Sequence, residues 1–422
     1  MPDTVKAVNL LKSIRHPCFS GCGGKLTRIH LPVAPGCNIQ CNYCVRKFDC
    51  PNESRPGVST AILSPEEALA RYLLVKERIG KPDVVGIAGP GDALANFAAV
   101  RGTISLIRDS EPDATFCIST NGLLLPLYAD ELAALGVSHV TVTLNAVDPA
   151  IGRRIYRYVH FQGRRYTGLE GAKILLERQL EGIDRAQALG MVIKINIVML
   201  MGLNDRHIPK IVEAAREKGA DLSNIMQLIP VKGSLLEHLP LISNAEIMAT
   251  RRKCEAILPQ MYHCRQCRAD AVGALDQDIS RTLDEGFPSE RASVAAAGCS
   301  AAESSGAGEG EALRFAVASN RGYVVDQHFG HAHSFYIYEY QDGRVSLLER
   351  RDIPQYCFGP AECRDHEALF GGIAGIIGDC AGVIVMRIGE APREMLAERG
   401  IRVFMTYNYV TDAVKEAAAA IR

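Results

Sequence analysis

The chain has 422 residues, 47% of them hydrophobic, and its 47 lysines and arginines almost balance its 48 aspartates and glutamates. This length and apolar content exclude a disordered chain and leave room for two or three domains. The near-neutral charge lacks the basic footprint of nucleic-acid-binding proteins, so we expect no nucleic-acid partner.

The sequence predicts neither a membrane span nor a signal peptide. The apolar run at residues 371–386 is too short and too rich in glycine for a bilayer span, and it contains Asp379. Residues 1–19 carry Lys6 and Lys12 between short apolar stretches and have no small-residue cleavage site. We therefore expect a cytoplasmic protein without membrane contact. Its fourteen cysteines would stay reduced, as metal ligands, buried apolar residues or redox groups.

Composition divides the chain into two parts. Residues 286–312 are small and polar and include ESSGAGEG at 303–310, a composition that predicts a flexible linker. The linker would separate a first domain over residues 1–285 from a second over residues 313–422.

The first domain alternates predicted strands and helices. Short apolar, β-branched runs predict strands at residues 28–33, 83–88, 114–119, 139–144, 192–200 and 224–229. Apolar residues spaced by three and four predict helices at 65–79, 127–135, 168–189 and 206–218, the first with Ser64 and Pro65 at its start. This alternation favours a parallel sheet covered by helices and closed, or partly closed, as a barrel. Chemistry in such folds gathers at the carboxyl ends of the strands.

The second domain is expected to be a small mixed α/β domain. Its strands are predicted at residues 313–318, 334–339, 346–348, 382–386 and 401–405, and its helices at 363–370, 391–398 and 410–421.

The strongest chemical signal is a loop directly after the first predicted strand, with the sequence CNIQCNYC at residues 37–44. Cys37, Cys41 and Cys44 can surround one cuboidal cluster, but they lack the fourth ligand of a closed zinc site or a fully ligated cluster. The alternatives are a zinc site completed from elsewhere in the chain or three buried thiols.

The cysteine spacing, the barrel pattern and Tyr43 before the last cysteine resemble the radical S-adenosylmethionine (SAM) enzymes. The resemblance implies a partial (β/α)6-type radical SAM barrel. It also implies that Cys37, Cys41 and Cys44 hold a [4Fe-4S] cluster whose free iron binds the amino and carboxylate groups of SAM. Cleavage of SAM would then produce a 5′-deoxyadenosyl radical.

The same resemblance implies which residues position SAM. Gly91, in the glycine-rich loop after the second strand, would contact the methionine moiety, because glycines let the backbone approach a ligand. Tyr43 would touch the adenine, and Thr143, Asn145 and Ile195 would line the pocket. Packing inside the barrel is the alternative role for Thr143 and Ile195.

Further motifs narrow the resemblance. They are HPC at residues 16–18, ESRPGV at 53–58, GIAGPGDALAN at 86–96 and CRQCRADAVG at 264–273. Together with CNIQCNYC they resemble the NifB family of nitrogenase cofactor maturases, and the second domain resembles the NifX-like cofactor carriers, which are ribonuclease H-like. This implies a reaction that fuses two [4Fe-4S] clusters, with a carbide from SAM and an extra sulfide, into an [8Fe-9S-C] precursor. The implied partners are an iron-sulfur cluster donor, cofactor carrier and maturation proteins, and a reductant protein.

The resemblance also implies ligands for the two auxiliary clusters. One set is expected at His16, Cys264 and Cys267, and the other at Cys18, Cys50 and Cys117. Incomplete thiolate sets suit clusters that must leave when the product forms. Glu53 and Arg55 are the candidates for proton transfer or cluster support. Cys22 follows the HPC motif closely and competes as a ligand.

His328, His331 and His333 precede a predicted strand of the second domain, and the last two share a side if the stretch is extended. They are candidates for holding an iron-sulfur product, with surface histidines as the alternative.

Two other functions remain open for the whole chain. One is a different radical SAM enzyme with auxiliary clusters acting on a nucleotide or peptide, and the other is a passive iron-sulfur scaffold or carrier.

Overall fold

The chain forms two compact units, Met1–Gly298 and Cys299–Arg422, in a computed structural model. The structure describes residues 2–20, 26–56, 61–275, 277–280, 312–319, 322, 325, 327–354, 366–386, 388–406 and 408–421. Residues 286–311, which make up nearly all of the predicted linker, lie outside these described residues. Cys22 lies outside them too.

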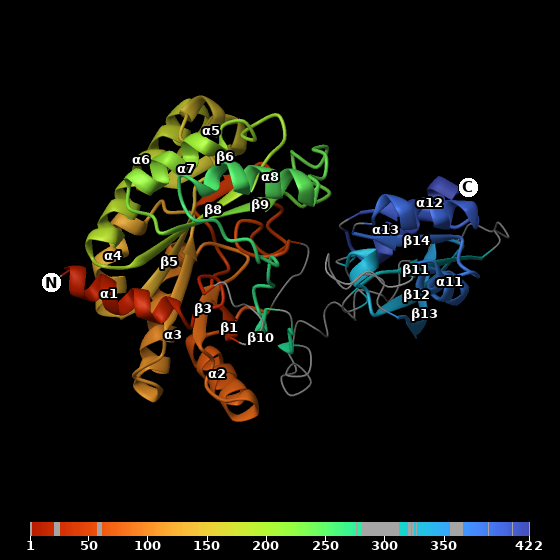
Figure 1. Ribbon diagram of the computed structural model, residues 1–422, viewed down its shortest axis with the longest axis horizontal. Helices are drawn as coiled ribbons and strands as arrows, with labels where there is room; N and C mark the ends of the chain where they lie inside the picture. The colour runs from red at the N-terminus through yellow and green to blue at the C-terminus, as the bar shows by residue number, and fades with distance from the viewer. Residues whose placement is uncertain are drawn as a thin grey trace. The chain divides into compact units, whose positions relative to one another are not determined.

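A seven-stranded sheet is the centre of the first unit. Its strand order is β10-β1-β3-β4-β5-β8-β9, and all neighbours are parallel except β10 against β1. The strands are β1 (Thr27–Pro32), β3 (Val84–Ala88), β4 (Phe116–Thr120), β5 (Val137–Thr143), β8 (Val192–Met199), β9 (Leu222–Gln227) and β10 (Val272–Ala274). The six parallel strands are the six predicted ones, and they curl into the expected partial barrel (Figure 1).

Helices surround this sheet. They are α1 (Pro2–Ser13), α2 (Pro65–Ile79), the 3-10 helix η1 (Ala93–Asn96), α3 (Phe97–Ser110), α4 (Leu125–Ala134), α5 (Pro149–Ile155), α6 (Gly168–Ala188), α7 (Ile208–Glu217) and α8 (Asn244–Glu255). Of these, α2, α3, α4, α6, α7 and α8 share the apolar core on the outer face of the sheet. Helix α2 has the predicted bounds because a capping box fixes its start: Ser64 Oγ accepts from the Glu67 N–H, and the Glu67 carboxylate accepts from the Ser64 N–H. Helices α1, α3, α5 and α8 were not predicted.

A small second sheet, which the sequence did not predict either, supports the cysteine loop. It has the order β2-β6-β7, with strands β2 (Ile39–Cys41), β6 (Tyr156–Phe161) and β7 (Arg164–Tyr166). Strand β2 lies inside the motif CNIQCNYC and pairs antiparallel with β6, with Ile39 opposite Val159. The ladder therefore fixes the backbone between Cys37 and Cys44.

Alternation along the barrel strands separates an apolar outer face from a polar inner face. On β8, Ile193, Ile195 and Ile197 are fully buried in the core between sheet and helices. Burial of each such side chain contributes ~1.5–3 kcal/mol. Lys194 and Asn196 point the other way and line a pocket inside the barrel. Because successive side chains of a strand point to opposite faces, the polar side chains of β8 point into the barrel.

The second unit contains a mixed sheet of order β13-β12-β11-β14-β15, in agreement with the predicted mixed α/β architecture. Its strands are β11 (Leu313–Val317), β12 (Ser334–Gln341), β13 (Arg344–Asp352), β14 (Gly382–Val385) and β15 (Arg402–Met405). Its helices are α11 (His366–Ile376), α12 (Glu390–Glu398) and α13 (Val410–Ile421), with the 3-10 helix η2 (Phe329–His331) before β12. Across the described parts of both units, no helix has the length and apolarity to cross a membrane.

Candidate functional site

The cysteine loop forms one wall of a pocket at the carboxyl ends of the barrel strands. Cys37, Cys41 and Cys44 line it together with Gly91 and Thr143, so it contains the predicted cluster ligands and two of the predicted SAM contacts. The side chain of Gln40 holds the loop closed by donating to the carbonyls of Cys41 and Cys44 at 3.0 and 2.9 Å. The three thiols therefore have a fixed backbone behind them.

Arg46 and Asn121 add donors around Cys37. The Arg46 guanidinium donates to the Ile39 carbonyl and hydrogen-bonds the Cys37 thiol. The Asn121 amide donates to Cys37 Sγ at 3.6 Å. Donors of this kind stabilise a thiolate and tune a cluster bound to it. Neither residue was singled out from the sequence.

The glycine-rich loop after β3 is fixed against the cysteine loop by backbone hydrogen bonds. The N–H of Gly91 donates to the Ala34 carbonyl and the N–H of Asp92 to the Gly36 carbonyl, both at 2.8 Å. The Asp92 carboxylate accepts from Thr120 Oγ1 at 2.9 Å and from the Asn121 N–H at 2.5 Å, which ties the loop to the end of β4.

Burial keeps the loop thiols protonated in the free protein. It raises the pKa of Cys41 to about 12 and of Cys44 to about 11, with neighbouring thiols raising Cys41 further. It also raises the pKa of Cys37, against the opposing effect of Arg46. Because iron binds the thiolate, loading this loop must release protons.

Three of the predicted SAM contacts lie elsewhere in the structure. Tyr43 is fully buried, its hydroxyl donating to Asn52 Oδ1 and accepting from Asn145 Nδ2 at 2.7 Å. The other amide atom of Asn145 accepts from the Val198 N–H at 2.8 Å, so both ends of this side chain are engaged. Ile195 lies in the apolar core on the outer face of β8.

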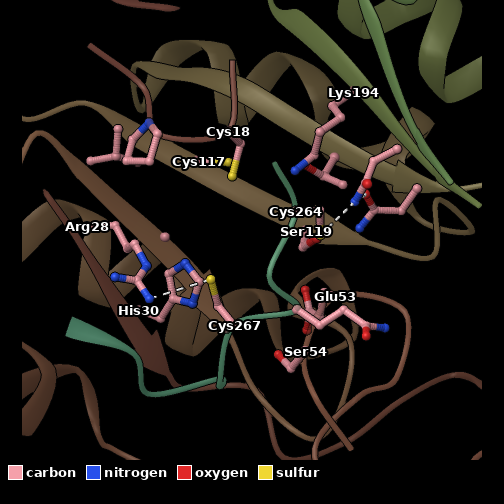
Figure 2. Close-up of a pocket in the computed structure, with 18 of the residues that line it drawn as sticks. Cys18, Arg28, His30, Glu53, Ser54, Cys117, Ser119, Lys194, Cys264 and Cys267 are labelled. Carbon is pink, nitrogen blue, oxygen red and sulfur yellow. Dashed lines mark hydrogen bonds between the residues drawn. The ribbon is translucent and has the colours of Figure 1, made fainter. Parts of the chain in front are cut away.

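A second pocket, called the cluster pocket below, lies inside the barrel (Figure 2). Segments far apart in sequence contribute five of the predicted auxiliary-cluster ligands: His16, Cys18, Cys117, Cys264 and Cys267. The cavity enclosed by the lining atoms measures about 80 Å³, which is smaller than the ~300–1,000 Å³ of a typical small-molecule site.

His16 has one ring nitrogen available inside the cluster pocket. Its Nδ1 accepts from the Cys18 N–H at 3.1 Å, whereas its Nε2 is buried and has no hydrogen-bond partner within the described part of the chain. A neutral imidazole that accepts at Nδ1 carries its proton on Nε2. Iron bound at Nε2 must therefore displace that proton or break the bond from Cys18.

The sixth predicted auxiliary ligand, Cys50, lines the cysteine-loop pocket and not the cluster pocket. Burial, followed by the neighbouring Glu53, Cys44 and Cys37, raises the pKa of its thiol well above the ordinary value. The structure therefore brings Cys18 and Cys117 together without Cys50.

Glu53 lines both pockets and so connects them. Burial raises the pKa of its carboxyl well above the usual range, although a hydrogen bond to Ser119 opposes the shift. The neighbouring Arg55 donates its N–H to the Cys267 carbonyl at 2.9 Å. This bond ties the Glu53 segment to one of the predicted cluster ligands.

Sequence reasoning missed the polar inner face of the barrel. Arg28, His30, Lys194, Asn196 and Asn224 all line the cluster pocket. The signal was present as polar residues at alternate positions of otherwise apolar runs, such as RIHLP and KINIV. For Lys194, burial lowers the pKa, but the thiols of the cluster pocket raise it above its ordinary value.

Side-chain amides link the two pockets. Asn52 lies 3.8 Å from Cys41 Sγ and accepts at its carbonyl from Asn196 at 2.8 Å. The Asn224 amide donates to Asn196 at 3.2 Å and to Cys264 Sγ at 3.3 Å. A continuous set of hydrogen bonds therefore joins a thiol of the cysteine loop to a thiol of the cluster pocket.

All ten cysteines in the described residues are free thiols. Within those residues, no three His, Cys, Asp or Glu side chains come together as a single metal ion requires. A cuboidal cluster binds each ligand through a different iron, so its ligands stand farther apart than those of one zinc ion.

The histidines of the second unit are only partly described. His328 caps η2 by accepting from the Gly330 N–H at 3.0 Å, and His333 is exposed. The side chain of His331 lies outside the described residues.

Sequence comparison finds relatives along nearly the whole chain. The FeMo cofactor biosynthesis protein NifB of Klebsiella pneumoniae is 44% identical over 408 residues, which cover 92% of this chain and 86% of that protein. The protein of the same name from Frankia alni is 39% identical over 452 residues, which cover 97% of this chain and 88% of that protein. The chain belongs to the NifB family.

Two family models match separate parts of this NifB-family chain. Residues 31–215 match the Radical SAM superfamily, and residues 311–420 match the family described as dinitrogenase iron-molybdenum cofactor. Membership of the Radical SAM superfamily implies a [4Fe-4S] cluster and SAM as cofactors. Among solved structures, Streptococcus suis SuiB bound to S-adenosylmethionine aligns with a TM-score of 0.42 at 14% identity, covering 56% of this chain and 50% of that chain.

Because His139 is buried as a neutral imidazole, the cluster-free chain should lose stability in acid. Burial lowers the pKa of His139 to about 3, aided by Lys12 and Lys194. The unfolded chain takes up this proton below about pH 6.5, so the stabilisation is complete above that pH and is lost as the pH falls towards 3.

We expect His139→Gln to reduce the slope of the unfolding free energy against pH, between about pH 4 and 6, by ~1.4 kcal/mol per pH unit. Urea unfolding across this range measures the slope. Equal slopes in the variant and the wild type would contradict a neutral, buried His139.

Proposed function

We propose that this chain fuses two [4Fe-4S] substrate clusters, with a SAM-derived carbide and an extra sulfide, into an [8Fe-9S-C] precursor of the nitrogenase cofactor. The observation that carries this proposal is the cluster pocket. It gathers His16 and four cysteines from separate segments and adjoins the radical SAM cysteine loop. The names of the NifB relatives support the same role.

In this proposal Cys37, Cys41 and Cys44 hold the radical cluster. The bound cluster and SAM supply a 5′-deoxyadenosyl radical. The backbone at Gly91 positions the methionine end of SAM, and Thr143 lines the same space. Tyr43, Asn145 and Ile195 support the pocket through the hydrogen bonds and packing already described, and their contact with SAM stays a prediction.

The auxiliary ligand sets follow the sequence prediction. His16, Cys264 and Cys267 would hold one substrate cluster, and Cys18, Cys50 and Cys117 the other. Cys50 would have to turn from the cysteine-loop pocket towards Cys18 and Cys117. Its position beside Glu53, which lines both pockets, makes that a local rearrangement.

Glu53 is suited to carry a proton between the pockets. Burial raises the pKa of its carboxyl and so favours the protonated form, which could donate a proton in the cluster pocket and recover it through Ser119. Arg55 would keep this segment in register through its bond to Cys267.

The second unit would serve as the cofactor carrier, in line with its match to the dinitrogenase iron-molybdenum cofactor family. The proposed organisation is a barrel domain over residues 1–285, a linker over 286–312 and a carrier domain over 313–422. His328, His331 and His333 remain the candidate product contacts. The proposed partners are a cluster donor, carrier and maturation proteins, and a protein reductant.

Anaerobic reconstitution with iron, sulfide, SAM and dithionite tests the proposed function. We expect 5′-deoxyadenosine together with a product that activates nitrogenase lacking its cofactor. SAM cleavage without a competent product would favour a radical SAM enzyme acting on a nucleotide or peptide. A protein that binds clusters without cleaving SAM would be a scaffold or carrier.

A further inference from the structure

Lys194 is a buried cation inside the cluster pocket. It is 7% exposed and extends from the inner face of β8, two residues before Asn196 on the same face (Figure 2). Among the described residues its ammonium makes no hydrogen bond and no ion pair. Its Nζ lies over the ring of Phe19, 5.9 Å from the ring centroid. A buried ammonium that forms no ion pair with the described residues is costly, so the pocket suits a bound anion.

The groups that interact electrostatically with Lys194 belong to both proposed ligand sets. They are the thiols of Cys18, Cys117, Cys264 and Cys267, the carboxyl of Glu53, and the imidazoles of His16, His30 and His139. All of these groups except His139 line the cluster pocket together with Lys194, so one ammonium shares a pocket with thiols that would hold two different clusters.

Arg28 and the exposed Arg265 also line the cluster pocket, and the side chain of Arg28 is bound to one side of it. Its guanidinium donates to the carbonyls of Gly273 and Ala274 and to Cys267 Sγ, the last at 3.5 Å. These bonds fix it next to a single ligand set. Lys194 has a flexible side chain, and among the described residues no acceptor holds its ammonium in place. It can therefore follow an anion that moves within the pocket.

We propose that Lys194 is the shared counter-charge that lets two anionic iron-sulfur clusters occupy one pocket before they join. This inference rests on the proposed function. Thiolate ligands make each cluster anionic, and two such clusters repel each other strongly in a water-poor cavity. A fixed positive charge between them lowers that repulsion, and Lys194 acts as a positioning residue for both substrates.

The test compares four full-length proteins after anaerobic reconstitution with iron and sulfide: wild type, Lys194→Met, Lys194→Arg and the exposed control Lys173→Met. Iron content, redox titration followed by electron paramagnetic resonance, and 5′-deoxyadenosine formation are measured. We expect Lys194→Met to bind about one third less iron, corresponding to one of three [4Fe-4S] clusters. The remaining auxiliary cluster should show a more negative midpoint potential, while SAM cleavage persists. Lys194→Arg should restore the iron content, and Lys173→Met should match the wild type.

Full iron content and unchanged potentials in Lys194→Met would overturn this inference alone. A wild-type protein that binds iron for only one cluster would overturn the proposed function and this inference together. If Lys194→Met also loses the radical cluster and its folded structure, Lys194→Gln replaces it as the neutral variant, and the same two readouts decide.

Discussion

Replacing Cys37 by alanine should abolish SAM cleavage, whereas replacing Cys264 should leave cleavage but no transferable product. Cys37 lines the cysteine-loop pocket and Cys264 lines the cluster pocket, so the two variants remove ligands from different sites. We expect 5′-deoxyadenosine formation by Cys37→Ala to drop by at least ~1,000-fold, or ~4 kcal/mol in the barrier. Chromatographic quantification of 5′-deoxyadenosine and a nitrogenase activation assay measure the two outcomes.

Cys254→Ala is the matched control. This residue of α8 is fully buried in the apolar core and lines neither pocket, so loss of its thiol should leave cleavage and product formation intact. Equal loss of cleavage in Cys37→Ala and Cys264→Ala would show that the two pockets do not have separate roles.

Replacing Gly91 by alanine should disrupt SAM binding and destabilise the first unit. An added Cβ would lie 1.9 Å from the Gly36 carbonyl oxygen and 2.8 Å from that of Ala34. Both are backbone atoms of the segment just before Cys37, so the glycine-rich loop must move away from that segment. Such overpacking costs ~1–3 kcal/mol, and more where the backbone cannot relax. Urea unfolding and equilibrium dialysis with SAM measure the two effects.

Gly371→Ala serves as the control for the glycine substitution. Gly371 lies in α11, where a Cβ meets no atom within 4 Å, so alanine should stabilise the helix by up to ~1 kcal/mol. Unchanged SAM affinity in Gly91→Ala would exclude a role for this loop in binding the cofactor.

The elements predicted from the sequence agree best with the structure where the sequence signal lies within the element itself. The positions of the six barrel strands follow from apolar runs, and the start of α2 follows from Ser64 and Pro65. The sequence pattern missed α3, although its buried positions, among them Val100, Ile104 and Ile107, follow the helical period. It also missed β2, β6 and β7, because these strands are short and are stabilised by pairing with distant partners.

Alternation along a strand run assigns its residues to two opposite faces, but it does not place either face in the fold. Ile195 and Lys194 are neighbours on β8, but one packs in the outer core and the other lines the cluster pocket. A continuous run does not say which of its two faces meets the helices. Only packing of the sheet against α2, α3, α4 and α6 decides this, because those helices offer an apolar surface to one face.

The sequence by itself determined the chemistry that this chain carries. The spacing of Cys37, Cys41 and Cys44, the HPC motif and the final CRQC motif are covalent features that any folded form retains. The tertiary structure decided which of these groups share a space. It places Cys18, Cys117, Cys264 and Cys267 around Lys194 and separates Cys50 from them. The physical reason is that segments up to about 250 residues apart meet only when the parallel sheet curls and its inward-facing side chains surround one shared interior.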